Sequence, residues 1–398
     1  MRVMMINHFP ISGSGSGTYT RNIAVHLMKK GHEICIIMPE NTTQYSSVPG
    51  ACMYPVYFTS DSSEEAIVEG LPFNFPCFTT HPRSTTSFFD LDDDQIEAYL
   101  AAFKRTIDKA VAEFKPDIIH AQHIWLLSWL ASKTGVPYVM TAHGTDLMGY
   151  QRSPRFRSYA DEAANGAKRI ITISNDNDEL VRELFPQCAD RTIFMRNGYD
   201  PSRFFPEPIP KEQVTGLFDI KLRERLVLFV GKLAHFKGID VLIDAARLYE
   251  SERPGEIVTI IAGDGELSED LRKQARDYGL KGTFFLGHLD ISQLRGLYSI
   301  ADVCIVPSRR EPFGLVAVEA LACGSVVVAT NQGGLPDIIN DRVGALVDVD
   351  DAFGLSAAIL SELYRPDREE RGRYAAKYAL ENYAQDTLMD TLIEIFSN

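Results

Sequence analysis

Short apolar runs alternate with amphipathic stretches of helical period through most of this sequence, and this alternation limits the folds that the chain can adopt. Strands are expected at Val3–Ile6, Ile34–Met38, Asp117–Ala121, Tyr138–His143, Arg169–Ile173 and Ile193–Arg196, and in a second series at Leu226–Val230, Val258–Ala262, Thr283–Leu286, Val303–Val306, Ser325–Ala329 and Ala345–Val347. A helix-like stretch after each strand is typical of parallel sheets with helices on both faces. We therefore expect an α/β chain of two doubly wound, Rossmann-like domains, with the cleft between them as the ligand site.

The length agrees with two domains, because 398 residues are more than one ordinary core accommodates. Clustered prolines without a hydrophobic period mark Pro201–Gly216 as the best linker. The expected domains are residues 1–203 and 204–378, followed by a tail over residues 379–398.

Helices are expected over Thr18–Lys30, Asp94–Phe114 and a long C-terminal segment, Arg368–Phe396. The periodicity breaks down between Asn41 and Asp94, where Ser, Thr, Pro and Phe predominate. We expect loops with little regular structure there.

The charge balance excludes several classes of partner. Lys and Arg total 40 against 54 Asp and Glu, a formal charge of −14. A nucleic-acid binder or a protein docked on an anionic membrane needs a basic surface, so neither is expected. No apolar run approaches the roughly 18 residues that span a bilayer. The six cysteines have no metal or redox spacing, and unpaired thiols indicate a cytoplasmic protein.

The most informative stretch runs from Val306 to Gly324, where a buried strand ends and a helix is expected to begin near Gly314. Free backbone N–H groups of Gly314, Leu315 and Val316 suit a phosphate. Two carboxylates, Glu311 and Glu319, would repel a phosphate, so in a nucleotide site they must accept hydrogen bonds from hydroxyl groups. In isolation, the same pattern is also that of an acidic helix start with a solvated glutamate.

Two further features lie at strand ends. Lys232 and Lys237 surround a glycine-containing turn and form a second possible anion site, although isolated lysines are more often solvated. In the first domain, Gly13, Gly15 and Gly17 follow the first strand and permit close approach of a ligand to the backbone. Their spacing departs from the dinucleotide fingerprint by one position.

Together these motifs resemble the retaining glycosyltransferases of family four, which have the two-domain GT-B fold. The resemblance rests on the Glu-x7-Glu element with Pro-Phe-Gly, the Gly-Lys-Leu…Lys-Gly element, Gly333–Pro336 and the glycine-rich loop. It implies that Glu311 contacts the donor sugar, that Glu319 contacts the ribose, and that Lys232 and Lys237 hold the diphosphate. Backbone groups of Phe313, Gly314, Leu315 and Val316 complete that site, and Gly15 with its neighbours Ser16 and Gly17 approaches the donor phosphate. The C-terminal helix in this fold crosses back to the N-terminal domain.

The sequence departs from the family pattern at two places. The family usually has Arg where this chain has Lys232, which keeps the charge but loses the two-pronged fork. The family's histidine usually comes second in a His-x-His element, and here Gln122 occupies that slot between His120 and His123. We favour His123 as the residue that faces the sugar, although any of the three is also compatible with packing at a strand end.

A His-Gly-Thr-Asp run follows the next strand and looks like that of relatives that glycosylate small soluble acceptors. His143, Thr145 and Asp146 are therefore candidates for acceptor binding, or else a hydrogen-bonded turn capped by Asp146. Arg152 begins a basic patch with Arg155 and Arg157 that suits an anionic acceptor, although a solvated loop is the more common explanation of such a patch. Acidic residues in Asp61–Glu69 and Asp90–Asp94 suit a cationic aminocyclitol.

We expect a metal-independent retaining glycosyltransferase without a cofactor. Its donor is a nucleotide-diphosphate sugar, UDP-sugar first, and its acceptor is a small soluble polyol, hydroxy acid, aminocyclitol or sugar. The Asp90–Asp94 aspartates precede a helix and are expected to cap it rather than to bind metal. Two alternatives stay open: an NAD-dependent oxidoreductase with tandem Rossmann domains, which uses Glu40 after strand two, and a catalytically silent nucleotide-sugar-binding protein.

Overall fold

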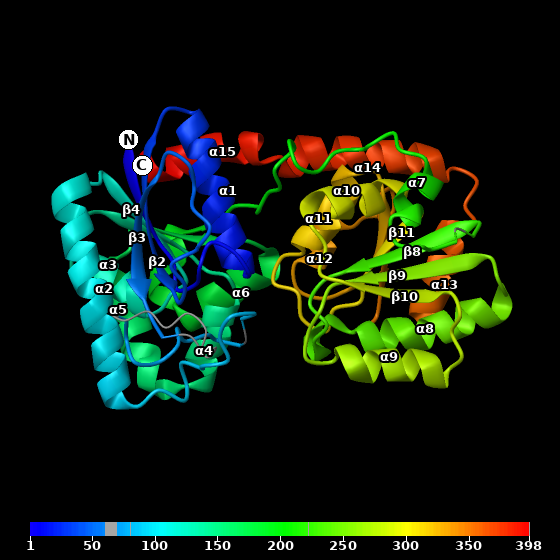
Figure 1. The fold of residues 1–398 in the computed structure, drawn as a ribbon. Coiled ribbons are helices and arrows are strands. Elements are labelled where there is room, and N and C mark those ends of the chain that lie inside the picture. The colour runs from blue at the N-terminus through cyan, green and yellow to red at the C-terminus, as the bar shows by residue number, and fades with distance from the viewer. Residues whose placement is uncertain (60–69, 80, 222, 398) are drawn as a thin grey trace. The chain divides into compact units, whose positions relative to one another are not determined.

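The computed structural model describes residues 1–59, 70–79, 81–221 and 223–397 and contains two compact α/β units (Figure 1). The first unit comprises Met1–Arg196 and Leu388–Asn398, and the second comprises Asn197–Thr387. The division falls slightly before residue 203 because Tyr199 hydrogen-bonds with both Tyr383 and Gln385, at 3.0 and 2.9 Å. The acidic segment Asp61–Glu69 lies outside the described residues.

The first unit is built on a seven-stranded parallel sheet with strand order β3-β2-β1-β4-β5-β6-β7. Its strands are β1 (Arg2–Ile6), β2 (Glu33–Glu40), β3 (Cys52–Tyr57), β4 (Ile118–Gln122), β5 (Tyr138–Thr141), β6 (Arg169–Thr172) and β7 (Thr192–Phe194). Its helices are α1 (Gly15–Lys29), α2 (Asp93–Phe114), α3 (Leu126–Ser132), α4 (Thr145–Arg152), α5 (Arg157–Gly166), α6 (Asn175–Leu184) and most of α15 (Gln385–Ser397).

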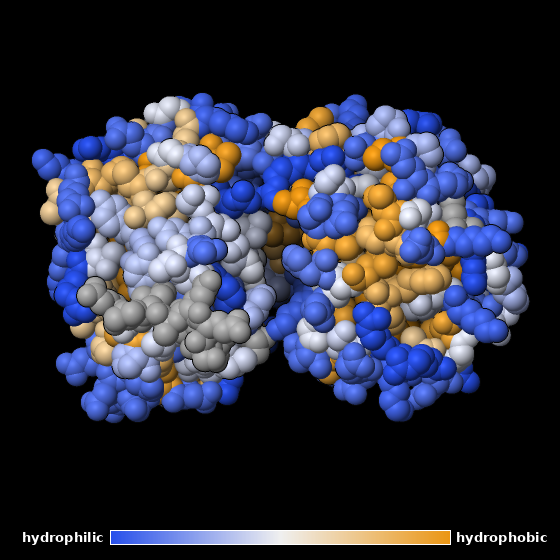
Figure 2. All heavy atoms as spheres, viewed as in Figure 1, coloured by the Kyte–Doolittle hydropathy of each residue, from blue (hydrophilic) through white to orange (hydrophobic). Residues whose placement is uncertain are grey.

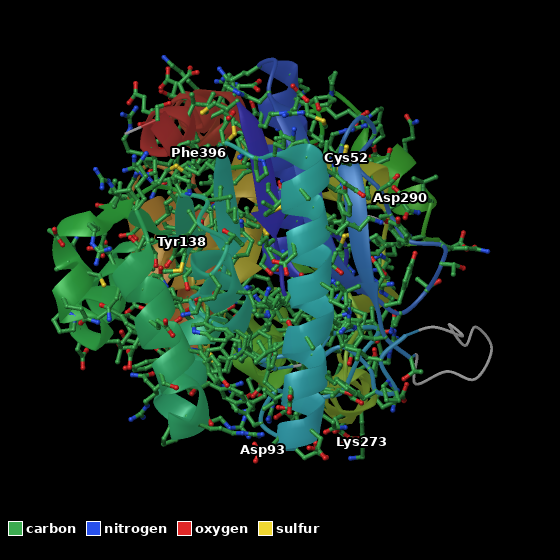
Figure 3. All side chains as sticks on the ribbon, turned by 90° about the vertical axis from the view of Figure 1, so that its left-hand side faces the viewer. Cys52, Asp93, Tyr138, Lys273, Asp290 and Phe396 are labelled. Atoms are coloured by element: carbon green, nitrogen blue, oxygen red, sulfur yellow. The ribbon has the colours of Figure 1, made fainter. Side chains whose placement is uncertain are left out.

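Alternate residues of each strand pack on opposite faces of this sheet, as the period of a strand requires. Met4 and Ile6 of β1 join the core formed with α2, α3 and α5, whereas Val3 and Met5 join the core formed with α1 and α15. Figure 3 shows α2 lying lengthwise in front of the sheet, with Asp93 at its N-terminal end and Phe396 on α15. The C-terminal helix therefore completes the core of the first unit.

Strand β3 corrects the expectation of loops over Asn41–Asp94. It pairs with β2 along its whole length, from Cys52 opposite Cys35 to Tyr57 opposite Glu40. The sequence concealed it because Pro55 interrupts the run, and proline is tolerated at the edge of a sheet, where no partner needs its missing N–H. Helix α1 begins at Gly15 rather than Thr18, because the Ser14 side chain caps the Gly17 N–H at 3.0 Å.

The second unit has a six-stranded parallel sheet with strand order β10-β9-β8-β11-β12-β13. Its strands are β8 (Arg225–Val230), β9 (Ile257–Ala262), β10 (Thr283–Gly287), β11 (Val303–Val306), β12 (Val326–Thr330) and β13 (Gly344–Val347). Its helices are α7 (Lys211–Gly216), α8 (Ile239–Glu252), α9 (Ser268–Asp277), α10 (Ile291–Ile300), α11 (Leu315–Ala322), α12 (Leu335–Ile338), α13 (Ala352–Leu363) and α14 (Arg368–Tyr383).

Helices cover both faces of the second sheet. Helices α8, α9 and α13 form a core on one face, and Figure 1 shows α10 and α11 on the other. The long C-terminal helical segment expected over Arg368–Phe396 is two helices, because Ala384 leaves the helical conformation at ψ 130° and pairs with Tyr199. Two parallel, doubly wound domains were expected from the sequence, and the structure confirms them.

The six cysteines are free thiols, as expected, and five of them are buried. In the described part of the chain, no helix is long and apolar enough to cross a membrane. Hydrophilic side chains cover most of the face seen in Figure 2, and hydrophobic ones gather over the strands of the second unit, whose edge strand β10 is half-buried.

Candidate functional site

The strand order of the second sheet places a ligand site beside β8. The chain adds β9 and β10 on one side of β8 and then β11, β12 and β13 on the other, so the order reverses between β8 and β11. Loops leave such a point in opposite directions at the carboxyl ends of the strands, and ligands bind in the crevice that remains. Lys232 and Lys237 follow β8, whereas Glu311 follows β11.

Lys237 and Glu311 form an ion pair at this point, with 2.6 Å between Nζ and Oε2. The two side chains are 19% and 11% exposed, so the pair is largely screened from solvent yet reachable. Gly238 makes the turn possible, because it has a φ of +67° and a Cβ there would lie 2.0 Å from the Pro307 carbonyl oxygen. The structure thus brings together two residues that are distant in the sequence and that the motifs singled out.

Lys232 lies on the same loop and is more exposed. Its Nζ is 3.3 Å from Glu266 Oε2, on the loop after β9. Two lysines therefore flank the carboxyl end of β8, each beside a glutamate that balances its charge. An incoming diphosphate would replace these carboxylates as the counter-ion.

The loop that follows β11 leads into α11. Gly314 is the N-cap of that helix, with a φ of +111°, and the side chain of Phe313 is buried. The N–H groups of Gly314, Leu315 and Val316 have no partner earlier in the helix, so they can donate to an anion. They follow directly after the loop that carries Glu311.

Glu319 lies one turn further along α11 and is partly buried. Its Oε2 accepts a hydrogen bond from the Tyr298 hydroxyl at 3.4 Å, and burial raises the pKa of Glu319 to about 7. A carboxylate held in such surroundings gains by accepting hydrogen bonds from ligand hydroxyls. Tyr298 lies on α10, and no pattern in the sequence singles it out.

The first unit has a second switch point, between β1 and β4. The rings of His8, His123 and His143 gather there, with centroid distances of 5.6 Å between His8 and His123 and 4.8 Å between His123 and His143. His123 is fully buried and has a φ of +73°, in the left-handed region that residues other than glycine seldom adopt. Backbone strain of this kind concentrates at functional sites.

Burial keeps these histidines neutral. It lowers the pKa of His8 and of His143 to about 3 and the pKa of His123 well below its ordinary value. His143 Nε2 lies 2.9 Å from Gln122 Oε1, whereas Gln122 Nε2 and His123 Nδ1 are buried and have no hydrogen-bond partner among the described residues. Buried polar atoms without partners are costly, and a ligand hydroxyl would satisfy both of them.

The other expected residues of this unit have structural partners. His120 faces α1 and α15, with Nε2 2.8 Å from the Thr141 hydroxyl and its ring against Phe396. Both carboxylate oxygens of Asp146 accept backbone hydrogen bonds, from Ile124 at 2.7 Å and His143 at 3.1 Å. Asp146 therefore joins the loops after β4 and β5, and burial raises its pKa to about 6.

The arginines of the basic patch also have partners within the first unit. Arg155 binds the Leu91 carbonyl and the Asp93 carboxylate, and Arg157 donates to the carbonyl of Tyr150 at 2.9 Å. Arg152 is exposed and lies over the Phe89 ring at 4.1 Å. Thr145 is the first residue of α4. The patch thus anchors the start of α2 and the end of α4.

The Asp90–Asp94 aspartates serve the start of α2, as expected. Asp92 accepts the Gln95 N–H at 2.8 Å in a capping box, and Asp93 pairs with Arg155. Within the described ranges, no group of three His, Cys, Asp or Glu side chains is arranged to hold a metal ion.

The glycine-rich loop after β1 is held by His81, which lies in the Asn41–Asp94 segment where loops were expected. His81 Nε2 lies 3.1 Å from the Ser12 carbonyl oxygen, and a Cβ on Gly13 would lie 2.7 Å from that nitrogen. Ser16 donates to Asn7 at 3.5 Å, and Gly17 approaches the Pro10 carbonyl so closely that a Cβ would lie 2.1 Å from it. Gly15 has open space around it.

Comparison with known proteins identifies the family of the chain. The family model for Glycosyltransferase Family 4 matches residues 13–203, and the model for Glycosyl transferases group 1 matches residues 217–379. A glycogen synthase of Mycobacterium tuberculosis is 30% identical over 397 residues, covering 96% of this chain and 90% of that protein. The chain belongs to glycosyltransferase family 4.

Other relatives of this glycosyltransferase differ in acceptor. A D-inositol 3-phosphate glycosyltransferase of Geodermatophilus obscurus is 30% identical over 334 residues, covering 77% of this chain and 73% of that protein. The structure of HepE from Anabaena in complex with UDP and glucose matches all of both chains, with a TM-score of 0.74 and 18% identity. That likeness shows the GT-B fold.

Proposed function

We propose that this glycosyltransferase transfers a hexose-type unit from a nucleotide-diphosphate sugar, UDP-sugar first, to a small soluble polar acceptor, with retention and without a metal. The observation that carries the proposal is the Lys237–Glu311 pair beside the α11 N-terminus. Cations and free N–H groups suit the diphosphate, and the carboxylates suit hydroxyls of the sugar and the ribose. The Anabaena neighbour, solved with UDP and glucose, supports the same donor class.

The chemistry would be mainly electrostatic. As the bond between the anomeric carbon and the phosphate oxygen breaks, negative charge grows on the leaving diphosphate, and Lys232, Lys237 and the α11 amides stabilise it. The acceptor oxygen attacks the same face of the anomeric carbon, and its proton passes to the departing phosphate oxygen. The neutral histidines of the first unit would bind hydroxyls rather than carry charge.

The acceptor is proposed to bind in the first unit, where Gln122 Nε2 and His123 Nδ1 find no hydrogen-bond partner in the part of the chain that the structure describes. A polyol, hydroxy acid, aminocyclitol or sugar carries the hydroxyls that would satisfy them. The relatives named for glycogen and for inositol 3-phosphate both act on polyhydroxylated compounds. We place the activity in the cytoplasm, in keeping with the six free thiols.

One observation weighs against the oxidoreductase alternative. A dinucleotide-binding domain uses the acidic residue after its second strand to bind the ribose. Here Glu40 is fully buried, and its Oε2 lies 2.7 Å from Arg83 Nη1. The carboxylate is therefore already paired within the protein. The oxidoreductase alternative also gives no role to the Lys237–Glu311 pair of the second unit.

The experiment is a transfer assay with UDP-glucose, myo-inositol 3-phosphate and maltotriose, in which UDP release and the anomeric configuration of the product are followed by NMR. We expect an α-linked product, with the rate unchanged within twofold by EDTA. An inverted product or a loss of activity that only manganese restores would contradict the mechanism. UDP binding without hydrolysis or transfer would favour the silent binding protein.

A further inference from the structure

The Glu311 carboxylate is held by one of its oxygens only. Oε2 accepts hydrogen bonds from Lys237 Nζ at 2.6 Å and from the Ser308 hydroxyl at 3.2 Å. Among the residues that the structure describes, no hydrogen bond to Oε1 is found. Glu311 as a whole is 8% exposed, so Oε1 is the oxygen that can meet a ligand.

The backbone of Glu311 is held by the loop between β12 and α12. Its N–H donates to Gln332 Oε1 at 2.8 Å, and its carbonyl accepts the Gly334 N–H at 2.9 Å. Gly333 allows this approach, because its φ is +58° and a Cβ there would lie 2.1 Å from the Glu311 carbonyl oxygen. The Gly-Gly-Leu-Pro stretch therefore acts on the site through the position of Glu311.

The backbone of Ser308 is also held by a hydrogen bond. Ser308 is fully buried, and its carbonyl oxygen accepts the Thr330 hydroxyl at 2.6 Å. Thr330 is the last residue of β12 and is only 2% exposed. The Ser308 hydroxyl thus has a rigid base in two neighbouring strands, whereas Lys237 reaches Glu311 on a flexible four-carbon stem.

These contacts differ in what a ligand does to them. A diphosphate carries more negative charge than one carboxylate, so it draws the Lys237 ammonium away from Glu311. Glu311 would then lose its counter-ion while the donor is bound, which is when its carboxylate must point toward the sugar. The bonds from Ser308 and Gln332 involve no charge that a phosphate competes for, so they persist.

We propose that Ser308 and Gln332 are positioning residues that keep Oε1 of Glu311 turned toward the donor sugar after Lys237 has moved to the diphosphate. This inference rests on the proposed function, since it assigns Glu311 to the sugar. It also explains why Glu311 is supported from two different loops, through Oε2 by Ser308 and through its backbone by Gln332.

The test is Ser308→Ala, with Ser325→Ala as the matched control, since Ser325 is equally buried at the start of β12 but donates only to a local carbonyl at 3.3 Å. Loss of one hydrogen bond to a charged group predicts a roughly ten- to hundredfold fall in kcat for UDP-glucose. The Kd for UDP should change by less than twofold, because UDP lacks the sugar. Ser325→Ala should leave both values unchanged.

A second pair of variants guards against misfolding. Thr330→Val removes the hydroxyl that anchors Ser308, and Thr330→Ser keeps it, so only Thr330→Val should lower kcat, again with UDP affinity retained. A merely structural role would lower UDP affinity and thermal stability together with kcat. An unchanged kcat in both Ser308→Ala and Thr330→Val would overturn the inference.

A crystal structure of the UDP complex separates this inference from the proposed function. If the wild type binds UDP but transfers no sugar, the proposed function fails. The inference would still require Glu311 to keep its orientation in the wild-type complex and to turn or become disordered in Ser308→Ala. The same ordered Glu311 in both complexes would refute it.

Discussion

Replacing Glu319 by glutamine should produce two opposite effects, because its buried carboxylate destabilises the free protein and strengthens nucleotide binding. The side chain is partly buried on α11 and accepts a hydrogen bond from the Tyr298 hydroxyl at 3.4 Å. Burial raises its pKa to about 7 from an ordinary 4.5. The folded chain therefore binds this proton more tightly than the unfolded chain does.

The sign and size of the stability effect follow from linkage. The penalty is absent below about pH 4.5, grows between pH 4.5 and 7 and is complete above pH 7, where the raised pKa corresponds to about 3 kcal/mol. Glutamine removes the charge but still needs hydrogen-bond partners. We therefore expect Glu319→Gln to increase the free energy of unfolding at pH 8 by about 1–2 kcal/mol, and to leave it nearly unchanged at pH 4.5.

The effect on UDP has the opposite sign. Loss of a charge-assisted hydrogen bond to the ribose should weaken UDP binding by about 1.5–3 kcal/mol, or roughly 10- to 150-fold at pH 8. In the wild type, the ionised fraction of Glu319 rises from about a tenth at pH 6 to about nine-tenths at pH 8. UDP affinity should therefore rise about tenfold more over this range in the wild type than in the variant.

Urea unfolding at pH 4.5 and 8, with calorimetric titration of UDP at pH 6 and 8, measures both effects. The Glu319→Gln titration serves as the control for ionisation of the nucleotide itself, since any pH dependence that remains belongs to UDP. A variant that is less stable at pH 8 would show that burial does not penalise the carboxylate. A variant that binds UDP as tightly as the wild type would refute the assignment of Glu319 to the ribose.

Three further predictions concern the supports of the two sites. Gly333→Ala should lower the unfolding temperature and the rate of transfer, because its Cβ would lie 2.1 Å from a backbone oxygen, whereas Gly216→Ala, with open space around it, should change neither. Phe396→Ala should destabilise the first unit by about 3–5 kcal/mol, measured by hydrogen exchange, and an equal effect of Phe353→Ala, which is 76% exposed, would contradict this. Because burial lowers the pKa of His143 to about 3, kcat should not change with pH through ionisation of this histidine between pH 5 and 8. The free energy of unfolding should fall as the pH drops below the ordinary histidine pKa of 6.5, since the unfolded chain then binds the proton more tightly. An inflection in kcat near pH 6.5 that His143→Gln abolishes would contradict the first of these two predictions.

The sequence was sufficient to predict the parallel sheets, apart from the edge strand β3, and to single out the two motifs of the second unit. Lys237 and Glu311 could be singled out because both follow strands, and parallel strands bring their carboxyl ends to one edge. That they touch depends on β8 and β11 being neighbours, which the strand order shows and local pattern does not. Ser308 and Gln332 could not be singled out for the same reason, because their proposed role depends on a third strand, β12, lying beside β11.

Side-chain partners could not be read from local sequence in the first unit. Asp146 suggested an acceptor ligand or a hydrogen-bonded turn, and local sequence could not show that the loop after β4 supplies a second N–H for its other oxygen. Arg155 resembled an anion site, but the start of α2 lies against it. His8, which had no motif, takes part in the histidine cluster because β1 lies next to β4.

The central claim, that the switch point of the second unit binds a nucleoside diphosphate, is tested most directly by calorimetric titration of the whole chain with UDP, GDP, ADP and NAD. We expect UDP to bind most tightly, NAD not to bind, and Lys237→Gln to weaken UDP binding at least tenfold. Binding of NAD but of no nucleoside diphosphate, or UDP binding that is unaffected by Lys237→Gln, would contradict the account.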